Sequence, residues 1–394
     1  MLSNGVDIDA AWQRLRSLRS QPPGRAAKGE RRRVFGSALE QCEQLVRAAR
    51  AVGYASRPIL LFYAWSQAGR AVAAVSVATG NEQYRLTGHG LHVADLDQRP
   101  PLHRLTLIDK GKGAFTQLAA MLDSGSLPKG ATLGQVWAAI PNLLCPPPDH
   151  HDTGWKPPLR VRGVEVKRNP EAARMTGFVA SLPEWFTHRD LSAADVADFF
   201  RSYPTLGASE TCPKEWMPPS SIPPGAVLRM PGDVLEMARA WPVSDAPLPD
   251  DLLGAHFAWE RTEPYLTQVD RSAYPTLGGA DRQIQPFLAW WAALFALSML
   301  ARYEPASWTR HLDVDASPDA VPLETMLDRA LEACPLLVLN AIRQVIGEGR
   351  GGFRLNGWTP DRAREVNDRS GQPLGWYRGP TPINARDGLP TASL

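Results

Sequence analysis

Lysine is scarce in this 394-residue chain, since only seven of its 43 basic residues are lysine and 36 are arginine. The 41 acidic residues almost cancel these charges and leave a formal net charge of +2. With so little net charge, the chain has no overall field that attracts nucleic acid or an anionic membrane. Any such binding must come from a local group of charges. Residues 1–50, with ten basic against five acidic residues, show that the charge is unevenly distributed.

Cysteine and long apolar runs are also scarce. The cysteines lie far apart, unlike the dense spacing of a disulfide-stapled secreted domain, at positions Cys42, Cys145, Cys212 and Cys334. The longest apolar run, residues 286–301, is shorter than the ~20 residues that a membrane span needs. Asp7, Asp9 and several arginines precede any apolar stretch, unlike a secretory signal. These features predict a cytoplasmic protein that does not interact with a membrane.

Familiar cofactor and metal motifs are missing from the sequence. It contains no Walker A loop, dinucleotide-binding glycine pattern, nucleophile elbow or zinc-deaminase signature. One group has metal-ligating residue types without a metal-ligating spacing, and three prolines interrupt it: Cys145, His150, His151 and Asp152. We therefore predict neither a cofactor nor a metal site.

Proline is unevenly distributed and divides the chain. Residues 141–250 hold 18 of the 36 prolines, whereas residues 31–140 hold four. Because proline interrupts helices, the middle third is predicted to contain connectors and short strands, such as 159–167 and 175–182. Ser192 with Asp195 predicts a capped short helix there, and residues 232–240 predict a second one.

Helical patterns flank this middle third. A first helix begins near Ile8, a basic loop covers 24–33, and Ser37 with Glu40 forms a capping box that predicts the start of the next helix. Further helices are expected at the ranges 56–80, 114–122, 133–144, 287–303 and 323–346. The segment 56–80 is apolar almost all round, which indicates a buried central helix.

These patterns together predict an α+β protein, in which N- and C-terminal helices form one bundle and a proline-rich β-containing region is inserted between them. The predicted divisions are a first helix with its basic loop, an N-terminal helical region, the insert, the C-terminal helices and an irregular tail, at 1–34, 35–145, 146–282, 283–347 and 348–394.

A polar pair interrupts the apolar central helix. Gln67 and Arg70 lie there, and an arginine is seldom buried without a partner because desolvating its charge is costly. The end of a second apolar helix offers Arg302, Tyr303 and Glu304. One interpretation is a structural ion pair between Arg70 and Glu304. The other is a polar pocket in which these five residues hold an anionic or nucleotide group.

A second candidate site is a glycine-flanked histidine. His89 lies between Gly88 and Gly90, followed by His92, in a position suited to a general acid or base or simply to a turn. Arg85 and His92 are separated by six residues, a spacing similar to that of HEPN ribonucleases, in which arginine stabilises phosphate and histidine assists proton transfer without metal. The intervening glycines do not favour the helix that carries this motif. His89, His92 and Arg85 are the candidate catalytic residues.

Three segments carry a family resemblance: the run Arg57 to Arg70, the turn Gly88 to Leu91, and the run Leu297 to Trp308. Together they resemble the YaaC-like proteins of bacteria. The resemblance extends over most of residues 10–345, and it implies a soluble bacterial protein without implying a reaction. The resembling segments contain Arg70, His89 and the Arg302–Glu304 run.

Two functional hypotheses follow. In the first, the protein binds RNA, another nucleic acid or a nucleotide, and one form of this hypothesis is a HEPN-like, metal-independent ribonuclease in stress or phage defence. In the second, it is a non-catalytic assembly or adaptor protein that binds a protein partner or forms a homo-oligomer, with exposed Trp and Tyr side chains as anchors.

Overall fold

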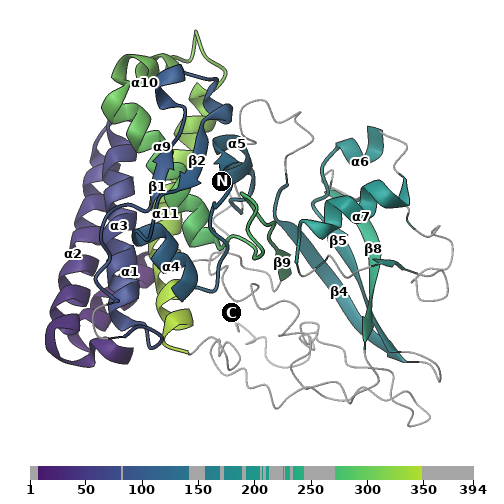
Figure 1. The fold of residues 1–394 in the computed structure, drawn as a ribbon, viewed down its shortest axis with the longest axis horizontal. Coiled ribbons are helices and arrows are strands. Elements are labelled where there is room, and N and C mark those ends of the chain that lie inside the picture. Colours follow the sequence, from purple (N-terminus) through teal and green to yellow (C-terminus); the bar gives the residue numbers. More distant parts are fainter. Residues whose placement is uncertain are drawn as a thin grey trace, which may run out of the picture.

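Helices from both ends of the chain pack together, and two antiparallel sheets are built from the sequence between them (Figure 1). The computed structural model describes residues 8–80, 83–141, 156–168, 173–188, 192–204, 206, 210–212, 225, 227–230, 234–243 and 271–347. This arrangement confirms the predicted α+β class.

The N-terminal helices are α1 (Ile8–Ser20), α2 (Gly29–Ala51) and α3 (Arg57–Val75), with a short 3-10 turn, η1 (Gly24–Ala27), before α2. The predicted start of α2 at Ser37 was wrong, as was the basic loop at 24–33. The buried side of α2 already includes Arg31 and Phe35, so the buried face of the helix extends into the segment predicted to be a loop. The spacing of Ser37 and Glu40 therefore occurs in a helix interior.

The end of α3 is held by the buried side chain of Arg31. Its guanidinium donates hydrogen bonds to the carbonyl oxygens of Ala74 (3.4 Å), Ser76 (3.3 Å) and Thr79 (3.2 Å), and it lies 4.4 Å from the ring centre of Tyr84. The last carbonyls of a helix have no partner within the helix. Arg31 supplies one, and so links the start of α2 to the end of α3.

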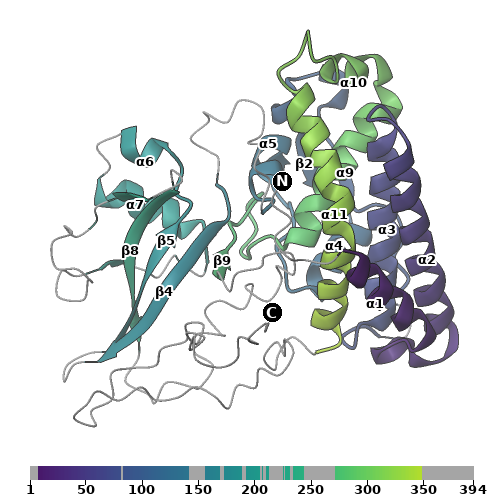
Figure 2. The same ribbon diagram turned by 180° about the vertical axis from the view of Figure 1, so that it is seen from behind.

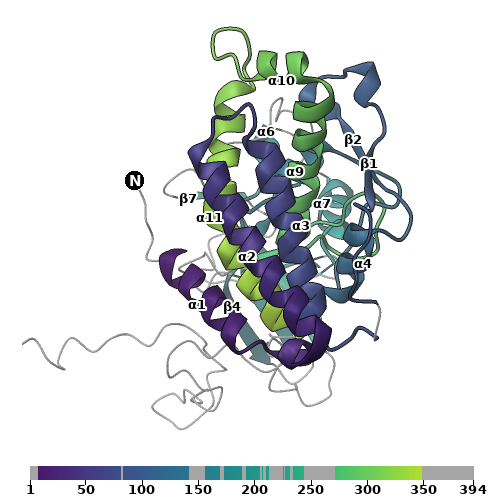
Figure 3. The same ribbon diagram turned by 90° about the vertical axis from the view of Figure 1, so that its left-hand side faces the viewer.

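The C-terminal helices are α9 (Pro286–Tyr303), α10 (Pro305–His311) and α11 (Ala320–Val345). They join the N-terminal helices in one apolar core (Figure 3). Cys42 of α2 and Cys334 of α11 are fully buried with their sulfurs 3.8 Å apart. In the part of the chain that the structure describes, α9 alone is long and apolar enough to cross a membrane, but 83% of it is buried inside the protein. It is the core helix of the bundle.

A small sheet lies beside the bundle and was not predicted. Its strands are β1 (Leu91–Val93), β2 (Thr106–Asp109) and β3 (Ala131–Thr132), paired antiparallel in the order β1-β2-β3. The short turns η2 (Leu96–Gln98) and η3 (Leu102–Arg104) and the helices α4 (Ala114–Met121) and α5 (Leu133–Ala138) complete this region. It packs against α3 and α9, and its strands β1 and β2 lie to the right of these helices in Figure 3.

The larger sheet is built from the middle of the chain. Its order is β6-β8-β5-β4-β9, with β7 also paired to β8, and the strands are β4 (Leu159–Arg168), β5 (Ala173–Ala180), β6 (Glu210–Thr211), β7 (Val227–Met230), β8 (Val234–Val243) and β9 (Arg271–Ala273). Helices α6 (Trp185–His188) and α7 (Ala193–Arg201) lie beside this sheet (Figure 2). The predicted strands at β4 and β5 and the capped helix α7 are confirmed.

The helix predicted at 232–240 was wrong, because that segment forms β8. Its residues Val234 to Met237 pair with β7, and Glu236 to Val243 pair with β5, both in an antiparallel register. Leucine, methionine and alanine favour helices, but pairing with partners on both sides outweighs that local preference. The predicted tail at 348–394 and the Cys145 to Asp152 group lie outside the described residues.

Candidate nucleic-acid interface

A glycine-rich turn fixes the position of His89. Gly88 and Gly90 have φ angles of 61° and 77°, in the left-handed region that favours glycine. The carbonyl of His89 accepts a hydrogen bond from Phe115 N–H at 3.0 Å, and that of Gly90 accepts one from Lys110 N–H at 3.0 Å. A Cβ on Gly90 would lie 2.8 Å from the carbonyl carbon of Gly113. The turn is therefore held against the start of α4.

The imidazole of His89 lies against the seam between α3 and α9. Its ring centre is 5.2 Å from that of Phe62 and 5.8 Å from that of Phe295, while the residue remains exposed to solvent. Partial burial lowers the pKa of His89 below its ordinary value of 6.5, and the positive charges of Arg302 and Arg70 lower it further. At pH 7 its imidazole is therefore mainly neutral and can accept a proton.

Arg70 and Arg302 approach this histidine from two helices. Arg70 is half-buried on α3 and donates to Ser66 Oγ at 3.4 Å. Arg302 is exposed at the end of α9, with its guanidinium 4.9 Å from the ring centre of Tyr303 and donating to the Tyr303 hydroxyl at 3.1 Å. Neither arginine forms an ion pair with a carboxylate among the residues that the structure describes. We call the group Arg70, His89, Arg302 and Tyr303 the basic surface.

The predicted ion pair between Arg70 and Glu304 was wrong. Glu304 instead accepts a hydrogen bond from Arg99 at 2.9 Å. Helices α3 and α9 run antiparallel, since Phe62 contacts Phe295 and a Cβ on Gly69 would meet Trp291. Arg70 lies about two turns from this level in one direction and Glu304 more than two turns in the other, so their Cα atoms are roughly 25 Å apart.

Of the other residues predicted for the site, Gln67 lies beside Arg70, whereas Arg85 and His92 lie apart from the basic surface. Gln67 is half-buried one turn before Arg70, on the same side of α3. Arg85 forms an ion pair with Glu30 at 2.7 Å, and its charge is not one of those that act on His89. His92 is exposed on β1, opposite Ile108. Arg85 and His92 thus do not lie on one helix, so the HEPN-like arrangement suggested by their spacing is not formed.

Two lysines near His89 were not identified from the sequence. Lys110 and Lys112 are exposed in the glycine-containing loop between β2 and α4, and the Lys110 backbone bonds to Gly90. Within the described segments neither lysine has a carboxylate partner. Their rarity could have drawn attention to them in the sequence, because the chain has only seven lysines and two of them occur in this loop.

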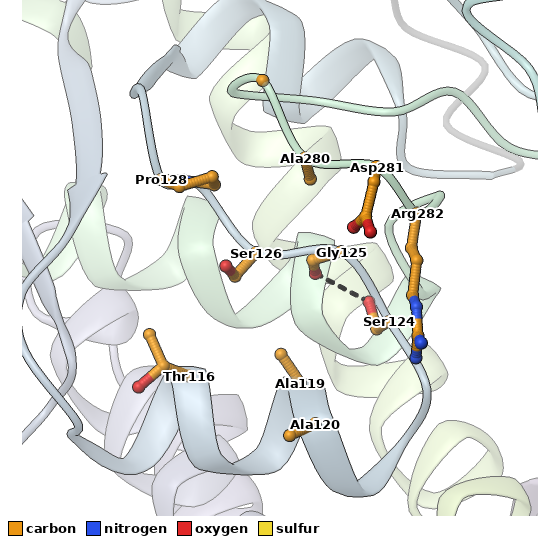
Figure 4. Close-up of a pocket in the computed structure, with 11 residues that line it drawn as sticks. Thr116, Ala119, Ala120, Ser124, Gly125, Ser126, Pro128, Ala280, Asp281 and Arg282 are labelled. Atoms are coloured by element: carbon orange, nitrogen blue, oxygen red, sulfur yellow. Dashed lines mark hydrogen bonds between the residues drawn. The ribbon is translucent and has the colours of Figure 1, made fainter.

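A shallow cavity of about 430 Å³ lies farther along α4 (Figure 4). Its polar side chains are largely used within the protein. Thr116 donates to the Gly111 carbonyl at 3.1 Å, Ser124 donates to the Gly125 carbonyl at 2.8 Å, and Arg282 forms an ion pair with Asp123. The lining otherwise consists mainly of small residues, so few groups remain to orient a ligand.

Metal-ligating side chains do not gather in the described portion, where no group of three or more His, Cys, Asp or Glu side chains could hold a metal ion. The groups that the basic surface offers to a ligand are the positive charges of Arg70 and Arg302 and the imidazole of His89.

Two segments of the chain, residues 9–151 and 241–342, match the YaaC-like protein family. The chain belongs to the YaaC-like family. The matched segments cover more than half of its length. They contain the whole of α2, α3, α9 and α10, nearly all of α1 and α11, and the basic surface. The unmatched stretch between them contains β4 to β7, so it corresponds to most of the larger sheet. The resemblance to YaaC-like proteins is confirmed, and the one to HEPN domains is not shown. No curated protein and no solved structure matches the chain.

Proposed function

We propose that this YaaC-like protein binds the phosphate groups of a nucleic acid or nucleotide at the basic surface. One observation supports the proposal above all: the charges of Arg70 and Arg302 act on the same histidine, and no carboxylate neutralises either arginine among the described residues. Guanidinium groups donate paired hydrogen bonds to phosphate oxygens. The arrangement places positive charge on both sides of an imidazole at a solvent-exposed position.

Among the residues that the structure describes, some arginines are neutralised within the fold, unlike Arg70 and Arg302. Arg16, Arg19 and Arg57 each meet a carboxylate, as expected for arginines that serve the fold. The guanidinium groups of Arg70 and Arg302 each lack a carboxylate partner in this described part of the chain and can attract an anion. Because the net charge is only +2, this local pair is the kind of feature that can hold an anion in a nearly neutral protein.

The test is a direct binding titration with two fluorescent probes, a nucleoside triphosphate and a random-sequence RNA, at about 50 mM salt. The wild-type protein is expected to bind at least one probe. The double substitution Arg70→Gln and Arg302→Gln is expected to weaken that binding about 10-fold or more. Arg14→Gln is the matched control, because Arg14 is exposed on α1, across the bundle from β1 (Figure 3).

Two results overturn the proposal. One is that neither probe binds to the wild-type protein, which favours an adaptor that acts through protein contacts. The other is that the double variant binds as tightly as the Arg14→Gln control. Recovery of nucleotides or nucleic acid that co-purify with the protein, measured by mass spectrometry, identifies the natural ligand.

Metal-independent RNA cleavage is a second candidate function, favoured by the lowered pKa of His89 between two arginines. A neutral imidazole can take the proton of a ribose 2′-hydroxyl, whose oxygen then attacks the adjacent phosphorus. The bond to the 5′-oxygen breaks, that oxygen takes a proton from water, and the arginines stabilise the charged phosphate. Incubation of RNA with chelator should give 2′,3′-cyclic phosphate ends with the wild type and not with His89→Gln. His92→Gln, on exposed β1, should retain the activity.

A further inference from the structure

We infer that the ligand of the basic surface is a single-stranded nucleic acid, rather than a lone nucleotide or a duplex. This inference rests on the proposed function and specifies its ligand. Three features of the described structure carry it: the length of the basic surface, a second basic element beside it, and an exposed aromatic ring within it.

The basic surface is longer than one phosphate group. Phe62 and Phe295 mark a common level on the antiparallel helices α3 and α9, and His89 packs on both rings. Arg70 lies about two turns from this level along α3, and Arg302 lies about two turns from it along α9 in the opposite direction. Their Cα atoms are therefore on the order of 20 Å apart, with His89 between them. This separation suits phosphates a few nucleotides apart on one strand better than one isolated phosphate group.

A second basic element continues from the same turn. Lys110 bonds through its backbone to Gly90, directly after His89, and Lys112 follows in the same loop. Unlike Arg302 and Arg70, the two lysines are not among the charges that lower the pKa of His89. The surface is open here, since a Cβ on Gly88 or Gly111 would meet nothing within 4 Å. The lysines therefore suit additional phosphates of the same chain.

An aromatic ring is exposed at the Arg302 end. Tyr303 has 57% of its surface exposed and lies under the Arg302 guanidinium at 4.9 Å. Base stacking on an aromatic ring is a common contact in single-strand binding and tolerates any base sequence. The bases of a duplex are already stacked and paired, so they do not reach such a ring. The combination of spaced cations and an exposed ring therefore fits an unpaired strand.

The experiment compares four labelled probes by fluorescence anisotropy with the full chain: a single-stranded RNA about 12 nucleotides long, the DNA of the same sequence, the RNA duplex and a nucleoside triphosphate. Both single strands are expected to bind at least about 10-fold more tightly than the duplex and the triphosphate. Four side chains can each contact a phosphate: Arg70, Arg302, Lys110 and Lys112. If all four do, a plot of the logarithm of the single-strand binding constant against the logarithm of salt concentration should have a slope of about −3.

Two sets of variants separate this inference from the function on which it rests. Lys110→Gln with Lys112→Gln should reduce the salt slope by about 1.4 for the single strand and leave triphosphate binding unchanged. Tyr303→Ala should weaken single-strand binding, and Tyr303→Phe, which keeps the ring, should restore it. Circular dichroism confirms that each variant is folded.

The outcomes are distinguishable. If the triphosphate or the duplex binds as tightly as the single strand, with Arg70 and Arg302 still required, the inference fails and the proposed function stands. If Tyr303→Ala binds as well as the wild type, base stacking is excluded and the surface recognises only polyanionic charge, which also overturns the inference. If no probe depends on Arg70 and Arg302, both the inference and the proposed function fail.

Discussion

At the scale of single residues, His89 links the electrostatics of the basic surface to pH. Its pKa is lowered by partial burial and by Arg302 and Arg70, which face it from α9 and α3, while Phe62 and Phe295 supply the apolar contacts. A bound phosphate favours the protonated imidazole and so raises this pKa. Binding should therefore take up a proton.

The first prediction is that affinity for single-stranded RNA rises as the solution is acidified from about pH 7.5 to about pH 5.5. His89→Gln should lose this part of the pH dependence, measured by anisotropy at constant ionic strength. Equal dependence of RNA affinity on pH for the wild type and His89→Gln would contradict this role of His89.

Acid has the opposite effect on the stability of the free protein. The pKa of His89 in the folded protein lies below 6.5, so the unfolded chain binds more protons near that pH. Acid therefore lowers the free energy of unfolding.

A second residue-scale prediction concerns the two glycines that flank His89. Gly90→Ala adds a Cβ 2.8 Å from the carbonyl carbon of Gly113 at a φ of 77°, so it should cost about 3 kcal/mol or more. Gly88→Ala is the matched control, because its φ is 61° with open space around it, and strain alone should cost about 1 to 2 kcal/mol. Urea denaturation measures both. A Gly90 variant as stable as the Gly88 variant would show that the close contact with Gly113 is unimportant.

Part of the basic surface was recognisable in the sequence. The unusual polarity of Arg70 and the glycine-flanked His89 were visible, and the structure brings both together with Arg302. The partner of Glu304 was not predictable, because Arg99 lies in a loop with no periodic pattern and pairing depends on the level at which α3 and α9 meet. Arg85 has an ordinary local context, and nothing in it reveals the ion pair with Glu30.

At the scale of elements, Arg31 determines how α2 and α3 meet. It is buried and donates to carbonyls in and just after the last turn of α3, so its loss would leave buried acceptors unpaired. The third prediction is that Arg31→Ala destabilises the protein by about 3 kcal/mol or more. Its neighbour Arg32 is exposed and donates to the carbonyls of Ser20 and Ala27. Arg32→Ala should cost less than about 1 kcal/mol.

Chemical denaturation of these two variants gives the comparison. Similar midpoints for Arg31→Ala and Arg32→Ala would mean that Arg31 does not stabilise the end of α3. Nuclear magnetic resonance of the backbone amides near Thr79 should also change only in the Arg31 variant, because its guanidinium bonds to that segment.

Most elements could be predicted from periodicity, and the exceptions have two causes. Helix α3, helix α9 and strand β4 carry strong local patterns and were found. The start of α2 depends on burial of Arg31 against another helix, and β8 depends on pairing with β5 and β7. Strand β1 is only three residues long, so its pattern is too short to recognise.

At the scale of the whole molecule, helices from the N- and C-terminal parts of the chain form one hydrophobic core. Cys42 and Cys334 are separated by 292 residues in sequence, and their sulfurs are 3.8 Å apart with both side chains fully buried. Burial also raises the pKa of the Cys334 thiol, which further slows its reaction. The bundle therefore forms only when the C-terminal helices have packed on the N-terminal ones.

The fourth prediction follows from this packing of the C-terminal helices on the N-terminal ones. With Cys145 and Cys212 replaced by serine, neither remaining thiol should react with a thiol reagent in the native protein. Both should become reactive over the same denaturant range in which helical circular dichroism is lost, because α2 and α11 separate only on unfolding of the bundle. Rapid labelling of either thiol before that transition would show that the two ends of the chain open independently.

The most direct test of the central claim is the binding of a labelled single-stranded RNA to three proteins: the wild type, the Arg70→Gln and Arg302→Gln double variant, and the Arg14→Gln control. We predict that the wild type and the control bind equally and that the double variant binds about 10-fold or more weakly, with all three folded to the same extent. Equal binding by the double variant and the control, or no binding by the wild type, would contradict the claim that the basic surface is a nucleic-acid interface.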